Sequence, residues 1–92
     1  MNRCRLHIYY SGHVQGVGFR YSVKSLAIAF EATGTVGNLP DGRVELVAEG
    51  TREELEAFRR AIQDSEVGRF IRQENVSWIG ATSEFRGFEI VR

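Results

Sequence analysis

The sequence predicts an α+β fold whose elements follow the order strand, helix, strand, strand, helix, strand, with a short fifth strand at the end. Two kinds of periodicity indicate this order. Apolar and polar residues alternate over residues 3–11, whereas apolar residues recur every three or four positions over residues 20–30 and 52–64. Two strand–helix–strand units of this kind build a ferredoxin-like sandwich, with both helices on one face of the sheet.

The first strand and the first helix are each amphipathic. The apolar face of the strand at residues 3–11 is formed by Cys4, Leu6, Ile8 and Tyr10. The first helix is expected from about Arg20 to about Phe30, with an apolar stripe made of Phe19, Val23, Leu26, Ala27 and Phe30. Tyr21 directly follows Arg20; a contact with substrate is one interpretation of it, and packing at the start of the helix is the one expected.

The second half of the chain starts with a predicted hairpin. Residues 33–38 and 43–49 form its arms, because the Pro-Asp-Gly sequence at 40–42 favours a turn. A capping box at residues 51–54 begins the second helix, which is expected to end near Asp64. Residues 69–74 have a mixed pattern, after which residues 76–79 alternate as a fourth strand and residues 88–90 as a short last one. Trp78 is expected in the core.

Size, charge and cysteine content limit the classes of function. A chain of 92 residues is expected to form one domain, residues 1–92, and twelve basic residues balance twelve acidic ones. The net charge is therefore zero, and it gives no reason to expect a nucleic acid or an anionic membrane as partner. Cys4 is the only cysteine, so no disulfide can form within the chain. No apolar run reaches the ~18 residues that a membrane span needs. A cytoplasmic monomer without a signal peptide is the expectation.

A glycine-rich segment, Gly-His-Val-Gln-Gly-Val-Gly-Phe-Arg at residues 12–20, connects the first strand to the first helix. Its glycines permit a tight turn in which successive N–H groups converge on an anion, and the helix N-terminus adds positive potential. Arg20 supplies a planar fork suited to phosphate oxygens. The spacing differs from that of dinucleotide and Walker loops, and glycine content alone fits a plain turn equally well.

The order of the residues is more specific than the glycine content. Residues 14–20, Val-Gln-Gly-Val-Gly-Phe-Arg, resemble the signature of the acylphosphatase family, and residues 34–45 resemble the family's second signature, with Asn38 at its Asn position. The end of the chain, residues 87–92, is similar to the family's last strand. The resemblance implies a ferredoxin-like fold and hydrolysis of an acyl phosphate to a carboxylate and inorganic phosphate, with Arg20 and Asn38 as catalytic residues.

The physical chemistry of phosphoryl transfer agrees with these roles. The phosphoryl oxygens would be held by Arg20 and by the main-chain N–H groups of Gln15, Gly16, Val17, Gly18 and Phe19. Asn38 would orient the attacking water, since its amide is not a strong base. A carboxylate leaves readily as an anion and needs no general acid, so no metal or cofactor is expected. Phosphate or sulfate should bind as product-like ligands. The fold brings Asn38 near the glycine-rich segment, because the first and third strands are central.

Two positions depart from the family pattern, and other functions stay open. Position 35 is Thr instead of the usual Trp, and position 37 is Gly instead of Arg or Lys. Gly37 is expected to loosen the backbone beside Asn38, so that Gly37→Arg would raise turnover. Without the motif, Asn38 is a turn former. A non-catalytic module that binds acyl phosphate, carbamoyl phosphate or another anion is one alternative. An RNA-binding sheet is another, but residues 44–49 carry no aromatic side chain for it.

Overall fold

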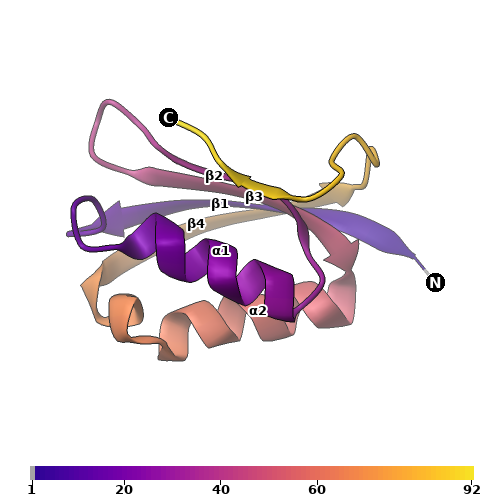
Figure 1. The fold of residues 1–92 in the computed structure, drawn as a ribbon, viewed down its shortest axis with the longest axis horizontal. Coiled ribbons are helices and arrows are strands. Elements are labelled where there is room, and N and C mark those ends of the chain that lie inside the picture. Colours follow the sequence, from indigo (N-terminus) through magenta and orange to yellow (C-terminus); the bar gives the residue numbers. More distant parts are fainter. Residues whose placement is uncertain (1) are drawn as a thin grey trace.

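The computed structural model describes residues 2–92 and confirms the predicted order of elements. Both helices lie on one face of a sheet whose other face they leave uncovered (Figure 1). The strands are β1 (Arg3–Gly12), β2 (Thr33–Asn38), β3 (Val44–Thr51), β4 (Ile71–Gly80) and β5 (Phe88–Ile90), the helices are α1 (Phe19–Ala29) and α2 (Arg52–Asp64), and a 3₁₀ turn spans Glu66–Phe70. Among the described residues no helix combines the length and the apolar character needed to cross a membrane.

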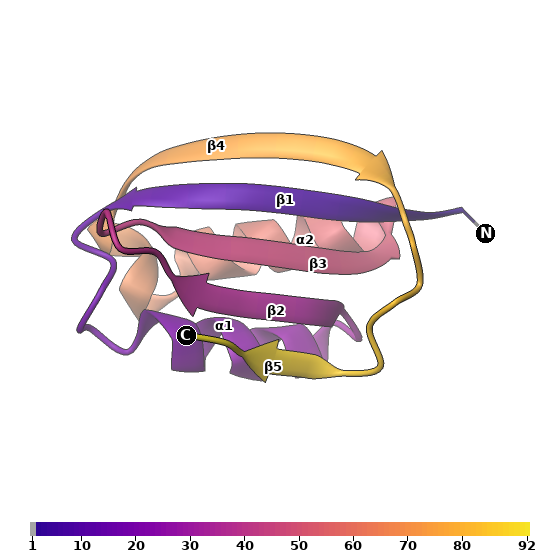
Figure 2. The ribbon, with the colours of Figure 1, turned by 90° about the horizontal axis from the view of Figure 1, so that it is seen from above.

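The sheet has the strand order β4-β1-β3-β2-β5, which confirms that β1 and β3 are central. All neighbouring strands are antiparallel except β2 and β5, which run parallel along one edge (Figure 2). The β1–α1 loop, the β2–β3 turn and the last residues after β5 consequently lie toward the same end of the sheet. The topology therefore gathers three segments that are distant in the sequence.

The core lies between the sheet and the two helices, where the alternating residues of β1 meet the helical stripes. Leu6, Ile8 and Tyr10 of β1 are fully buried. The helices contribute the buried side chains Phe19, Val23, Ala27, Leu55, Phe58 and Ile62. Burying one such Leu, Ile or Phe side chain stabilises the fold by about 1.5–3 kcal/mol. Leu26 and Phe30, predicted for the stripe of α1, are only partly buried and pack at its margin.

Three details differ from the sequence-based expectation. At the start of α2 the Thr51 hydroxyl accepts a hydrogen bond from the N–H of Glu54 at 3.2 Å, but within residues 2–92 the Glu54 carboxylate accepts no hydrogen bond in return. The mixed residues 69–74 divide between the 3₁₀ turn and β4, because pairing with β1 begins at Ile71. Trp78 is only partly buried on the edge strand, with the Arg52 guanidinium 3.8 Å from the centre of its ring.

Candidate active site

The β1–α1 loop, residues 13–18, is anchored by the His13 N–H, which donates to the carbonyl oxygen of Phe70 at 3.0 Å, and by the side chains of Val14 and Gln15. The Val14 side chain is 1% exposed and belongs to the core. Gly16 and Gly18 have φ angles of 80° and 82°, in the left-handed region where a side chain is strained. Within residues 2–92, the N–H groups of residues 15–19 donate to no protein acceptor. The loop thus presents a run of unpaired donors directly before α1, as an anion cradle requires.

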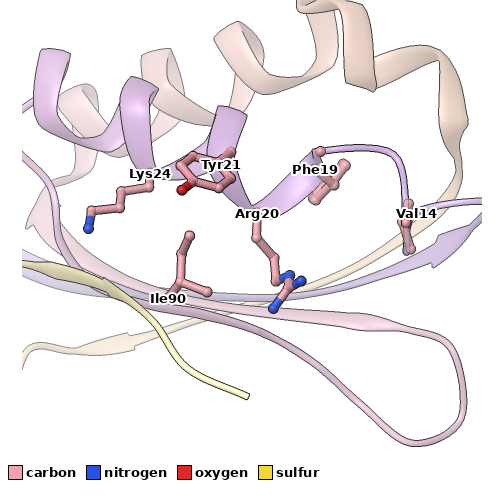
Figure 3. Close-up of a pocket in the computed structure, with 8 residues that line it drawn as sticks. Val14, Phe19, Arg20, Tyr21, Lys24 and Ile90 are labelled. Atoms are coloured by element: carbon pink, nitrogen blue, oxygen red, sulfur yellow. The ribbon is translucent and has the colours of Figure 1, made fainter.

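Arg20 stands on the first turn of α1, beside these donors. Its Nη1 donates to the main-chain oxygen of Arg92 at 2.9 Å. In the described part of the chain its Nε and Nη2 have no protein acceptor, so most of the fork is available to a ligand. The cavity at this place has a volume of about 340 Å³ and is lined by Val14, Gly16, Gly18, Phe19, Arg20, Tyr21, Lys24 and Ile90 (Figure 3).

Asn38 is the last residue of β2, and it donates to the same oxygen atom as Arg20. The Asn38 N–H donates to the main-chain oxygen of Arg92 at 3.4 Å, the same atom that Arg20 contacts. The side-chain Oδ1 of Asn38 is buried and has no hydrogen-bond partner among the described residues. Buried acceptors are nearly always paired with protein or water, so this atom is suited to accept a hydrogen bond from a water molecule. Asn38 does not itself line the cavity described above.

The side chain of Gln15 makes contacts that were not predicted, since only its main-chain N–H was expected to have a role. Its side-chain Nε2 donates to the carbonyl oxygen of Leu39 at 2.8 Å and to that of Arg43 at 3.0 Å. These two carbonyls belong to the base of the β2–β3 turn, next to Asn38. The Gln15 amide therefore ties the loop to the turn. No sequence signal identifies such a bond, because its acceptors are main-chain atoms more than twenty positions away.

Glu45 holds Arg92 from the uncovered face of the sheet. Its carboxylate accepts from Arg92 Nη2 at 2.8 Å and lies 2.8 Å from His7 Nε2. Burial by itself raises the pKa of Glu45, but the contacts with His7 and Arg92 outweigh it and leave this pKa below its usual range. Glu45 is therefore ionised at neutral pH and fixes the residue whose main-chain oxygen joins Arg20 to Asn38.

Two expectations about this region are wrong. Gly37 is buried, and a Cβ there would overlap the carbonyl oxygen of Val91. Gly37 therefore allows two segments of the backbone to pack closely and does not loosen the backbone beside Asn38. Tyr21 does not pack at the start of α1; it is 76% exposed and lines the cavity. Lys24 and Ile90 also line it and were not predicted. Lys24 follows Arg20 by four residues, and this helical spacing is a signal that could have identified it.

The comparison with known proteins agrees with the two motifs. The family model named Acylphosphatase matches residues 6–90. The acylphosphatase of Thermobifida fusca is 37% identical over 97% of this chain and 98% of its own length, and that of Pelotomaculum thermopropionicum is 40% identical over 98% of both chains. The crystal structure of acylphosphatase from Bacillus subtilis superposes with a TM-score of 0.87 at 35% identity, covering 97% of this chain and 99% of that one. The chain belongs to the acylphosphatase family.

Proposed function

We propose that this protein is an acylphosphatase that hydrolyses acyl phosphates to a carboxylate and inorganic phosphate, with the phosphoryl group in the β1–α1 loop. Membership of the family, with relatives of this name along nearly the whole of both chains, supports the reaction. One structural observation supports the site: the unpaired N–H groups of residues 15–19 and the open side of the Arg20 fork meet at one cavity.

The loop and Arg20 would act on the charge of the transferring group. That charge is spread over three oxygens, and preorganised donors stabilise it without having to reorient during the reaction. Water attacks phosphorus, and the bond between phosphorus and the acyl oxygen breaks. The carboxylate leaves with the electron pair of that bond, and the protons of the water stay on the phosphate or pass to solvent.

Asn38 would position the attacking water. Its unpaired Oδ1 can accept a hydrogen bond from the water and hold it in line with the departing acyl oxygen. The contact of its N–H with Arg92, which also binds Arg20, supports a fixed distance between the water site and the phosphate site.

The alternative of a non-catalytic anion-binding module is not favoured, because the full-length relatives are acylphosphatases by name. The proposal also includes phosphate or sulfate as product-like ligands, no nucleic-acid partner, and a monomeric cytoplasmic protein. The balanced charge of the chain supports the second of these points.

The first test replaces Arg20 by Lys and measures hydrolysis of benzoyl phosphate together with competitive inhibition by inorganic phosphate. The lysine keeps the charge but loses the planar fork, so kcat/KM should fall by about 100-fold or more and the inhibition constant of phosphate should rise. Arg60→Lys, on the exposed face of α2, is the matched control and should leave both values unchanged. Unchanged kinetics in Arg20→Lys would contradict the site.

The second test replaces Asn38 by Ala. Because Asn38 is proposed to hold the water and not the phosphate, kcat should fall by about 100-fold while the phosphate inhibition constant stays nearly constant. A loss of phosphate affinity equal to that of Arg20→Lys would make Asn38 a phosphate ligand. No change in either quantity would make it a turn residue only.

A further inference from the structure

The cavity beside Arg20 extends past the place proposed for the phosphate. Val14, Gly16 and Gly18 line it at the loop, whereas Tyr21, Lys24 and Ile90 line it farther along α1 and β5 (Figure 3). Its volume of about 340 Å³ is within the range of about 300–1,000 Å³ for small-molecule sites and exceeds the space that a single phosphate group fills. The second end of the cavity is therefore the place for the acyl part of the substrate.

The side chains at this acyl end combine an apolar wall with one cation. Tyr21 presents an aromatic ring that is 76% exposed, and Ile90 lies across from it on β5 as a half-buried apolar side chain. Such surfaces suit the carbon chain of an acyl group. Lys24, the only lysine among the 92 residues, stands beyond them.

Lys24 is electrostatically available to a ligand. Within residues 2–92 no carboxylate forms an ion pair with it, whereas seven ion pairs occupy other side chains. The charged side chains that line the cavity are Arg20 and Lys24, and both are cations. They stand four residues apart on one helix, so their Cβ atoms are about 5–6 Å from each other. In a chain with no net charge, this cavity therefore concentrates positive charge locally.

We propose that the acyl end of the cavity selects acyl phosphates whose acyl chain ends in a carboxylate, which Lys24 binds while Arg20 and the loop hold the phosphate. The single ammonium of Lys24 balances one negative charge, which fits a carboxylate better than a second phosphate group. The inference rests on the proposed function, since it assigns the phosphate to the Arg20 end.

The test compares succinyl phosphate with butyryl phosphate, which has the same number of acyl carbons and no carboxylate. The wild-type protein should have a higher kcat/KM for succinyl phosphate, mainly through a lower KM, because Lys24 contributes binding and not chemistry. Lys24→Met should lower the ratio of the two kcat/KM values by about 5-fold, the size of one partly exposed charge contact. Lys24→Arg should keep most of the ratio, and Lys24→Glu should reverse it.

Two controls separate a local contact from a general effect of charge. Arg60→Met removes the same charge from the exposed face of α2 and should leave the ratio unchanged. Raising the ionic strength from about 0.01 M to about 0.15 M shortens the screening length from about 30 Å to about 8 Å and should reduce the wild-type ratio, but hardly that of Lys24→Met.

Each outcome bears on a distinct claim. If butyryl phosphate is hydrolysed in an Arg20-dependent way and the ratio is the same in wild type and Lys24→Met, the assignment of the acyl end is overturned while the proposed function stands. If neither acyl phosphate is hydrolysed, both are overturned.

Discussion

A single main-chain oxygen, that of Arg92, accepts hydrogen bonds from both Arg20 and Asn38. Gly37 determines how closely the segment with Val91 and Arg92 can pack against β2. The N–H of Val91 donates to the carbonyl oxygen of Val36 at 2.9 Å, which places Val91 against the backbone of Gly37. A larger residue would have to push this segment away. The absence of a side chain at position 37 is therefore a packing requirement of this protein.

Gly37→Ala tests this requirement. The added methyl group meets the carbonyl oxygen of Val91, so the free energy of unfolding should fall by about 1–3 kcal/mol, and kcat should fall as Arg92 and Asn38 shift. Gly37→Arg should be at least as damaging. Gly80→Ala is the matched control, because Gly80 has open space around it, and it should stay within about 0.5 kcal/mol of wild type. A rise in kcat with Gly37→Arg would restore the view that Gly37 loosens the site.

At the scale of elements, the Gln15 side chain adds a direct tie between the β1–α1 loop and the β2–β3 turn. The sheet already brings the two segments together, because Val44 of β3 pairs with both Tyr10 of β1 and Asn38 of β2, but the loop itself leaves the sheet after Gly12. The two hydrogen bonds from Gln15 Nε2 to the base of the turn hold the loop against the turn. A small displacement between the phosphate site and the water site would lower the rate steeply.

Gln15→Ala removes both bonds and should have two effects. The free energy of unfolding, measured by urea denaturation, should fall by about 1–2 kcal/mol, and kcat should fall by about 10-fold. Gln15→Glu has nearly the same shape but points a carboxylate at two carbonyl oxygens, so its losses should be larger. Gln73→Ala, at an exposed position of β4, is the control. An unaltered kcat in Gln15→Ala would show that the turn holds its position without this side chain.

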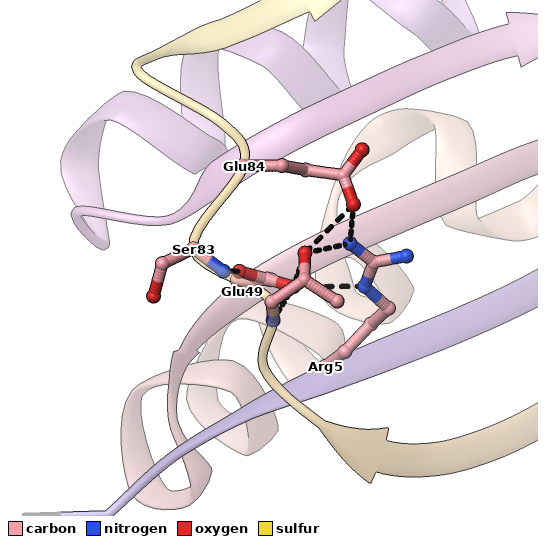
Figure 4. A network of polar contacts seen from close by, with 5 residues as sticks. Arg5, Glu49, Ser83 and Glu84 are labelled. Carbon is pink, nitrogen blue, oxygen red and sulfur yellow. Dashed lines mark hydrogen bonds and ion pairs between the residues drawn. The ribbon is translucent and has the colours of Figure 1, made fainter.

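At the scale of the whole molecule, a polar network closes the end of the sheet opposite the β1–α1 loop. Glu49 is fully buried and accepts from Arg5 Nε at 2.8 Å and from the N–H groups of Thr82 and Ser83 at 2.9 Å each (Figure 4). Burial alone raises the pKa of Glu49, but these hydrogen bonds and the Arg5 charge outweigh it, and this pKa is below its ordinary value of 4.5. The network fastens the β4–β5 connection to the sheet.

The lowered pKa of Glu49 makes its contribution to stability dependent on pH. A group with a lower pKa in the folded state stabilises the protein above its unfolded pKa, and this stabilisation is lost as the pH falls through the folded value. Glu49→Gln should therefore lower the free energy of unfolding by on the order of 3 kcal/mol at pH 7, and by clearly less at pH 3. Urea denaturation of both proteins at the two pH values measures the difference. If Glu49→Gln lowers the free energy of unfolding equally at both pH values, this role of Glu49 is contradicted.

The order of strands and helices, the central position of β1 and β3, and the residues of the two motifs could be predicted from the sequence. The order of elements and the motifs depend on local patterns, because a buried face of a strand or helix repeats with a fixed period and the glycine-rich segment is one continuous stretch. The central position of β1 and β3 followed instead from the ferredoxin-like topology that this order of elements implies. The limits of β4 could not be predicted, since an edge strand with one open face tolerates the mixed residues 71–74.

The tertiary structure alone decided how the site is held together. Arg20 meets the main-chain oxygen of a residue 72 positions away, the Gln15 amide binds carbonyls of a distant turn, and Gly37 leaves room for Val91. Main-chain atoms are the same in every residue, so contacts made through them carry no side-chain pattern. They become visible only when the fold has brought the β1–α1 loop, the β2–β3 turn and the chain after β5 to one end of the sheet.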